Sequence, residues 1–252
     1  MNPTAPTLPA WPYPRWIAHR GAGRLAPENT LAAFRAGARY GYRMFECDAK
    51  LSADGVVFLL HDDTLDRTTD SQGIAGVQPW SALSRHDAGR WHSRRYAGEP
   101  QPTLEALARF CQANACLLNI EIKPTPGLEE ETGRVVAREA ARLWAGAEVP
   151  PLLTSFQPQS LAGARETAPQ LPRGLLLDSL RDGWLGQAQA LGCVAIVCDQ
   201  NLWSAERMAA VHGAGLRALA YTVNEPAMAE WLWGLSIDGL ITDRVDLFSP
   251  DT

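Results

Sequence analysis

The chain lacks the features that mark several large classes of protein. Its 252 residues carry a formal net charge of −5, so it has no excess of the basic residues typical of proteins that bind nucleic acids or anionic membranes. No apolar run approaches the roughly 20 residues that a transmembrane helix needs. The opening stretch, MNPTAPTLPAWPYPRW, lacks the basic and apolar regions of a signal peptide. We therefore expect a cytoplasmic enzyme or binding protein.

Cysteine motifs and phosphate loops are missing as well. The five cysteines are an odd number and form no CxxC pair, which argues against a disulfide framework or a zinc ribbon. Most of them lie in apolar runs, so we expect buried free thiols. No Gly-rich loop of the GxGxxG or GxxxxGKS/T type follows a strand-like run, which argues against a nucleotide-binding fold.

What the chain does contain is a regular alternation of short apolar runs with helical segments. Runs that are apolar on both faces and separated by helices are typical of a parallel sheet covered on both sides. Eight such units in about 250 residues predict a (β/α)8 barrel, the TIM barrel of the α/β class, with a doubly wound open sheet as the alternative. The strand-like runs lie at 16–19, 43–48, 116–122, 151–156, 173–178, 193–199, 216–223 and 238–243. The helical segments are expected at 29–41, 103–113, 128–144, 158–168, 182–191, 204–213 and 226–234.

Two segments fall outside this alternation. Residues 1–14 are rich in proline and predict an extended N-terminal arm. Residues 49–102 separate the second strand from the next helix, and loops of that length usually carry function. We expect them to form a hairpin and then an insertion on the upper face of the barrel without a separate core. The whole chain, 1–252, is then a single catalytic barrel domain.

Charged residues gather where the first three strands end, which is where barrel enzymes carry their chemistry. The first strand ends in His19 and Arg20. Because alternate residues of a strand share a face, Glu46 and Asp48 project together from the second strand, and Glu121 projects with Lys123 from the third. Three carboxylates therefore converge from neighbouring strands.

Three buried like charges repel one another, and a divalent cation would resolve that repulsion. Carboxylate oxygens suit hard ions, so the sequence favours one Mg²⁺ or Ca²⁺ over zinc. The alternative is a salt-bridge network among the same acids, Arg20 and Lys123.

A second histidine reaches the same face if residues 50–61 form a hairpin. Asp54 and Gly55 are a turn signal between two strand-like runs. A two-residue Asp-Gly loop would place His61 opposite Asp48, and a turn centred on Ala53 and Asp54 would place it opposite Glu46. Both registers put His61 on the carboxylate face, whereas a one-residue bulge would reverse it. With His19 it would make a pair suited to general acid–base catalysis.

These residues together resemble the glycerophosphodiester phosphodiesterases, and most closely their cytosolic bacterial branch. The resemblance runs in order over about residues 16 to 246. Its motifs are HRG (19–21), PENT (27–30), ExD (46–48), DGVVFLLHDDTLDRTT (54–69), EIK (121–123), SF (155–156), AYTVN (220–224) and GLITDR (239–244).

The resemblance implies hydrolysis of glycerophosphodiesters to sn-glycerol 3-phosphate and an alcohol. It implies that His19 and His61 are the acid–base pair and that Arg20 and Lys123 contact the phosphate. Tyr221 stands where the family often has tryptophan, in the pocket for the glycerol or the headgroup. The metal ligands that it implies are Glu46, Asp48 and Glu121.

Other residues of the motifs are expected to be structural. PENT would orient the first loop and start the first helix, and Asp243 would cap the last strand and order its loop. We expect a small-molecule substrate, no nucleic acid and no stable membrane association, and the sequence leaves the oligomeric state open. The alternatives are a lysophospholipase D or phospholipase-type phosphodiesterase on the same fold and a non-catalytic phosphate-binding protein.

Overall fold

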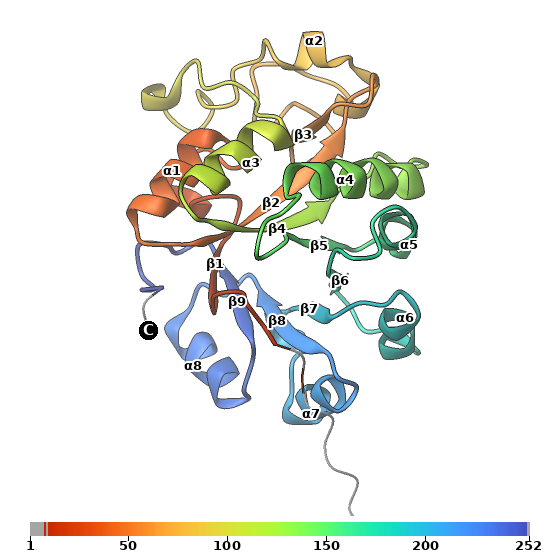
Figure 1. Cartoon of the computed structure of the whole chain (residues 1–252). Helices are drawn as coiled ribbons and strands as arrows, with labels where there is room; N and C mark the ends of the chain where they lie inside the picture. Colours follow the sequence, from red (N-terminus) through yellow and green to blue (C-terminus); the bar gives the residue numbers. More distant parts are fainter. Residues whose placement is uncertain (1–7, 9, 251–252) are drawn as a thin grey trace, which may run out of the picture.

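A computed structural model of the chain describes residue 8 and residues 10–250 (Figure 1). Most of the predicted arm at 1–14 therefore lies outside the described residues. The strands are β1 (Trp16–Ala18), β2 (Met44–Leu51), β3 (Val57–Leu59), β4 (Leu117–Ile122), β5 (Leu152–Ser155), β6 (Arg173–Leu177), β7 (Ala195–Asp199), β8 (Arg217–Tyr221) and β9 (Gly239–Thr242). The α-helices are α1 (Leu31–Arg39), α2 (Trp80–Leu83), α3 (Leu104–Ala113), α4 (Glu129–Leu143), α5 (Pro158–Thr167), α6 (Trp184–Ala190), α7 (Ala205–Gly213) and α8 (Pro226–Gly234).

Eight of the strands form a closed parallel barrel. Neighbouring strands follow the order β1-β9-β8-β7-β6-β5-β4-β2, and β1 also pairs with β2, which closes the ring. The ninth strand, β3, lies antiparallel on β2. Figure 1 shows the helices arranged around the outside of the strands. The predicted TIM barrel is confirmed, and the open-sheet alternative is wrong.

The two faces of each strand contribute to different apolar clusters. Inward side chains such as Ile17, Met44 and Ile241 fill the barrel, and Tyr13 packs against the same cluster. Outward side chains such as Ala18 and Cys47 pack against the helices. Because His19 follows Ile17 by two residues, and Glu46 follows Met44, their side chains lie on the inward face above this apolar floor.

Three of the helices begin at residues whose side chains cap them. Thr30, Thr103 and Ser204 each accept a hydrogen bond from the backbone N–H three residues on, at the starts of α1, α3 and α7.

The five cysteines are free and buried, as predicted.

The insertion between β2 and α3 was expected to have no core of its own, and this expectation was wrong. Phe58, Leu60, Leu65, Ala75 and Leu83 form a small apolar cluster of their own, with Trp80 packed against it. Figure 1 shows the segment that carries β3 and α2 at the top of the view, beyond the end of β2. Within the described part of the chain, none of the helices is both long and apolar enough to cross a membrane.

The close packing of α1 on the barrel gives a testable prediction about two glycines in helices. A Cβ on Gly37 would lie 2.1 Å from the carbonyl oxygen of Gly21 and 2.7 Å from the Phe45 ring, whereas a Cβ on Gly186 in α6 would have no neighbour within 4 Å. We expect Gly37→Ala to lower the free energy of unfolding by about 1–3 kcal/mol through overpacking. Gly186→Ala should raise it by up to about 1 kcal/mol through helix propensity. Urea unfolding of both variants checks the opposite signs.

Candidate active site

The loop after β1 brings a backbone donor and a cation to the mouth of the barrel. Arg20 adopts a left-handed conformation with φ of 49°, and its backbone N–H donates to Glu46 Oε2 at 3.0 Å. Its guanidinium lies 2.8 Å from Glu28 Oε1 and 3.2 Å from Asp48 Oδ2. The side chain therefore sits between the PENT segment and the acids of β2.

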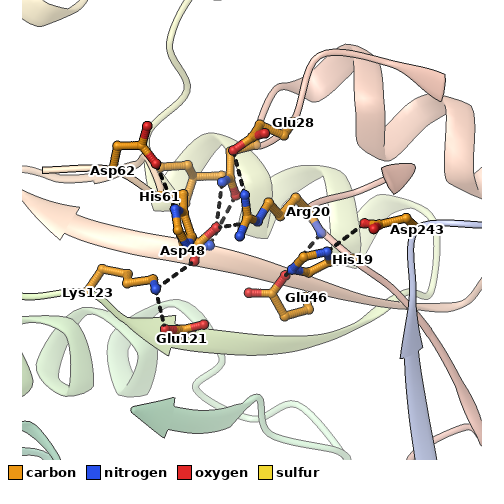
Figure 2. A network of polar contacts seen from close by, with 12 residues as sticks. His19, Arg20, Glu28, Glu46, Asp48, His61, Asp62, Glu121, Lys123 and Asp243 are labelled. Carbon is orange, nitrogen blue, oxygen red and sulfur yellow. Dashed lines mark hydrogen bonds and ion pairs between the residues drawn. The ribbon is translucent and has the colours of Figure 1, made fainter. Parts of the chain in front are cut away.

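The three predicted carboxylates converge on one point. Glu46, Asp48 and Glu121 each offer an oxygen, and these atoms lie within 4.8 Å of one another. All three side chains are buried. Asn29 donates from Nδ2 to Asp48 Oδ2 at 2.8 Å, and Lys123 Nζ lies 2.8 Å from Glu121 Oε1 and 3.9 Å from Asp48 Oδ1 (Figure 2).

The electrostatics of this cluster fit a hard cation. Burial, together with Asp48, raises the pKa of Glu121 to about 7, and burial and its two acidic neighbours also raise the pKa of Glu46. For Asp48, burial is outweighed by Arg20, His61 and Lys123, which hold its pKa at about 2. Glu46 Oε1 and Asp48 Oδ1 are buried and have no hydrogen-bond partner among the described residues. An all-oxygen set with unpartnered buried atoms fits Mg²⁺ or Ca²⁺.

His19 stands between a carboxylate of this cluster and Asp243. Its Nδ1 lies 2.7 Å from Asp243 Oδ1, and its Nε2 lies 3.8 Å from Glu46 Oε2. Burial would raise the pKa of Asp243, but the hydrogen bond from His19 outweighs it and holds the pKa at about 2. Asn224 donates to the other oxygen of Asp243 at 3.0 Å. The expectation that Asp243 only caps its strand and orders its loop was therefore incomplete, because its carboxylate orients His19.

His61 reaches the site, but by neither of the predicted registers. The pairs Ala49 with Leu59 and Leu51 with Val57 show a register that would put His61 opposite Cys47, on the outer face. However, β3 ends at Leu59, so His61 lies past the end of the strand and is not bound by its alternation. His61 Nδ1 lies 2.8 Å from Asp62 Oδ1. Burial lowers the pKa of His61, which favours the neutral imidazole near pH 7.

One cavity collects these groups. It has a volume of about 160 Å³, and both histidines, Glu46 and Glu121 line it. Its other lining residues include Arg20, Lys123, Asn119, Phe156 and Tyr221. A larger hollow of about 360 Å³ adjoins it, because His61, Glu121, Lys123 and Phe156 line both.

Tyr221 is held rigidly at the wall of the smaller cavity. Its hydroxyl donates to the carbonyl oxygen of Leu177 at 3.0 Å, and its ring meets the Phe156 ring edge-on with centroids 5.8 Å apart. A tyrosine with its hydroxyl engaged elsewhere presents its ring face or edge, not a polar group, to a bound molecule.

Several residues that complete the site escaped the sequence analysis as functional groups. Asp62 and Asp243 bind the two histidines, Asn29 binds Asp48, and the buried Asn119 lines the cavity floor. The motif HDDTLDRTT contains Asp62 next to His61, and this adjacency was the only signal in the sequence for that pair.

This fold, with acids and histidines gathered in one cavity at the carboxyl ends of the strands, places the chain among the (β/α)8-barrel enzymes. The glycerophosphoryl diester phosphodiesterase family profile matches residues 19–247. The chain belongs to this family and is a phosphoric diester hydrolase that acts on glycerophosphodiesters.

Three related proteins and structures match the chain over nearly its whole length. A glycerophosphodiester phosphodiesterase of Caldanaerobacter subterraneus subsp. tengcongensis is 30% identical over 90% of this chain and 93% of its own. The structure of an Oleispira antarctica phosphodiesterase, in complex with the product sn-glycerol-3-phosphate, is 31% identical and superimposes with a TM-score of 0.88 over 95% of this chain and 97% of that one. A glycerophosphodiester phosphodiesterase structure from Agrobacterium tumefaciens is 27% identical, with a TM-score of 0.78 over 94% and 99% of the two chains.

Proposed function

We propose that the chain hydrolyses glycerophosphodiesters to sn-glycerol 3-phosphate and an alcohol, using a divalent cation and two acid–base histidines. The observation that carries the proposal is the cavity itself, in which His19, His61, Arg20 and Lys123 surround the carboxylate cluster. The Oleispira phosphodiesterase, which holds this product, supports the choice of product through its similarity along the chain.

Glu46, Asp48 and Glu121 are the residues that would hold Mg²⁺ or Ca²⁺. When bound there, the cation supplies positive charge that offsets the charge of the phosphodiester and favours attack on phosphorus. Arg20 and Lys123 add to this charge at the cavity wall, where we propose that they contact the phosphate oxygens. Lys123 is well placed for this role, since its ammonium already lies between Glu121 and Asp48.

The two histidines are arranged for proton transfer. Each binds a carboxylate through Nδ1, which fixes the ring and leaves Nε2 as the atom that takes or gives a proton. A carboxylate on Nδ1 also stabilises the imidazolium that forms when Nε2 accepts a proton. One histidine would take a proton from the nucleophile while the other gives a proton to the leaving alcohol.

Tyr221 would shape the part of the cavity that receives the glycerol or the alcohol. Its fixed ring and Phe156 form an apolar corner of the cavity, and Lys123 Nζ lies 5.4 Å from the centre of the Phe156 ring. We also propose that the barrel and its insertion act as one catalytic domain over 1–252, because the insertion supplies His61. The five buried free cysteines support a reducing compartment such as the cytoplasm.

Release of glycerol 3-phosphate tests the proposal. The purified chain is incubated with several glycerophosphodiesters, with chelator alone and with Mg²⁺ or Ca²⁺ restored. We expect release only when a cation is present. If no substrate releases glycerol 3-phosphate under either cation, the proposed function is wrong and phosphate binding without catalysis becomes the better explanation.

The ligand assignment gives a further prediction about metal dependence. Glu46→Gln keeps the size of the side chain but removes the charge, so the cluster loses part of its attraction for a cation. We expect the variant to need at least about tenfold more Mg²⁺ or Ca²⁺ for half-maximal activity. Glu129→Gln, at the edge of the larger hollow, is the matched control and should keep the wild-type metal dependence. Equal metal dependence of Glu46→Gln and the wild type would remove Glu46 from the ligand set.

A further inference from the structure

Arg67, in the insertion, joins two carboxylates that come from separate parts of the chain. Its Nε and one terminal nitrogen bind Asp62 at 2.7 and 2.9 Å. Both terminal nitrogens bind the two oxygens of Glu28, at 2.7 and 2.8 Å. All four contacts have the length of strong charge-assisted hydrogen bonds, and the planar guanidinium fixes their directions.

Each of these carboxylates continues to a residue of the cavity. Asp62 Oδ1 lies 2.8 Å from His61 Nδ1, and Glu28 Oε1 accepts from the Arg20 guanidinium at 2.8 Å (Figure 2). A continuous line of contacts therefore runs from His61 through Asp62, Arg67 and Glu28 to Arg20. It connects the proposed acid–base group with the proposed phosphate ligand.

We infer that Arg67 is a positioning residue that sets the orientation of His61 and Arg20 together. Without it, Asp62 and Glu28 would each keep a single partner. His61 lies past the end of β3, so no strand pairing fixes its position, and its contact with Asp62 matters more. The Arg67 side chain is 44% exposed, so the pairs are expected to contribute little to the stability of the fold. Their main effect is on geometry, because a catalytic group must be held within about half an ångström of its working position.

The kinetic test of this inference rests on the proposed function. We expect Arg67→Ala to lower kcat roughly 10–100-fold, the range seen when an orienting partner of an active-site residue is removed. KM should rise as well, since Arg20 loses its restraint. Arg67→Lys keeps the charge but loses the planar guanidinium that donates to both carboxylates. We therefore expect Arg67→Lys to be only slightly more active than Arg67→Ala. Free guanidinium at sub-denaturing concentration should restore activity to Arg67→Ala, whereas ammonium should not.

Arg134 provides a matched control. It likewise bridges two carboxylates from different helices, Glu130 and Glu166, and is 34% exposed, but it lies on α4 and does not line the cavity. Arg134→Ala should leave kcat and KM unchanged, and guanidinium should have no effect on it. Thermal unfolding of both alanine variants separates a loss of fold from a loss of geometry.

A second measurement does not depend on turnover. The hydrogen-bonded Nδ1 proton of His61 is observed by NMR of the wild type and assigned through its loss in His61→Gln. We expect this signal to be lost or strongly shifted in Arg67→Ala and unchanged in Arg134→Ala. An unchanged His61 signal, or kcat within twofold of the wild type in Arg67→Ala, would overturn the inference. A wild-type enzyme inactive on every substrate would instead refute the proposed function, and the NMR comparison would still decide the role of Arg67.

Discussion

Replacing His61 with alanine is expected to lower kcat roughly 10²–10⁴-fold, the usual contribution of a general acid or base. The residue lines the cavity, and the contact between its Nδ1 and Asp62 leaves Nε2 for the reacting atoms. It lies outside the carboxylate cluster, so affinity for Mg²⁺ or Ca²⁺ should stay close to that of the wild type. Steady-state kinetics at saturating metal, with metal binding measured by calorimetry, check both parts. His19→Ala should lower kcat by a factor in the same range.

His86 gives a control for the loss of an imidazole. It lies in the same insertion as His61, but its contact is with Asp70, and it does not line the cavity. His86→Ala should therefore keep wild-type kcat. If His61→Ala turned over substrate at nearly the wild-type rate, the acid–base assignment of His61 would have to be abandoned, even though the residue lines the cavity.

The barrel could be predicted from the sequence because its signals are local. Most barrel strands are short, largely apolar runs that precede a helix, and Thr30, Thr103 and Ser204 cap three of these helices. The inward positions of Glu46, Asp48 and Glu121 follow from the two-residue period of a strand. Periodicity fixes such positions whatever the length of the loops between strands.

The hairpin register could not be predicted in the same way. Leu51 pairs with Val57, so five residues form the turn, where the Asp54-Gly55 signal suggested two. Within it, the Ser52 hydroxyl accepts from the backbone N–H of Val56 and donates to Asp54, and Gly55 adopts a left-handed conformation with φ of 80°. The Ser52 side chain and the dipeptide therefore shape the turn together. His61 reached the predicted face for a different reason, which is that the ladder ends before it.

Two pairs of residues at the site were missed because they join distant parts of the chain. His19 and Asp243 are 224 residues apart and meet only because β1 and β9 are neighbours in the closed barrel. Arg67 and Glu28 meet only because the insertion folds back over the first loop. A single sequence contains no local pattern for either pair. Even with the barrel predicted, the side-chain directions of a loop do not follow from the order of the strands.

The arrangement of charges and histidines raises the question of what attacks phosphorus. The nucleophile is either water or the 2-hydroxyl of the substrate's own glycerol. The second route gains from proximity, because a neighbouring group can reach an effective molarity on the order of 10⁵–10⁸ M. One histidine would take the 2-hydroxyl proton as the oxygen bonds to phosphorus, and the other would protonate the alcohol oxygen as its bond to phosphorus breaks. The histidines would then reverse roles as water opens the cyclic 2,3-phosphate to sn-glycerol 3-phosphate.

A substrate in which hydrogen replaces the 2-hydroxyl separates the two routes. We expect this analogue to bind, because it keeps the phosphate that we propose Arg20 and Lys123 to contact. It should turn over at least about 10³-fold more slowly than the parent, because the internal nucleophile is gone. Competitive inhibition of the parent reaction measures its binding, and alcohol release measures its turnover. The analogue with hydrogen in place of the 1-hydroxyl, which keeps both the phosphodiester at position 3 and the internal nucleophile, is the control and should react at a rate near that of the parent. If the 2-deoxy analogue also reacted at the parent's rate, water would be the nucleophile, and the histidines would act on water from the first step.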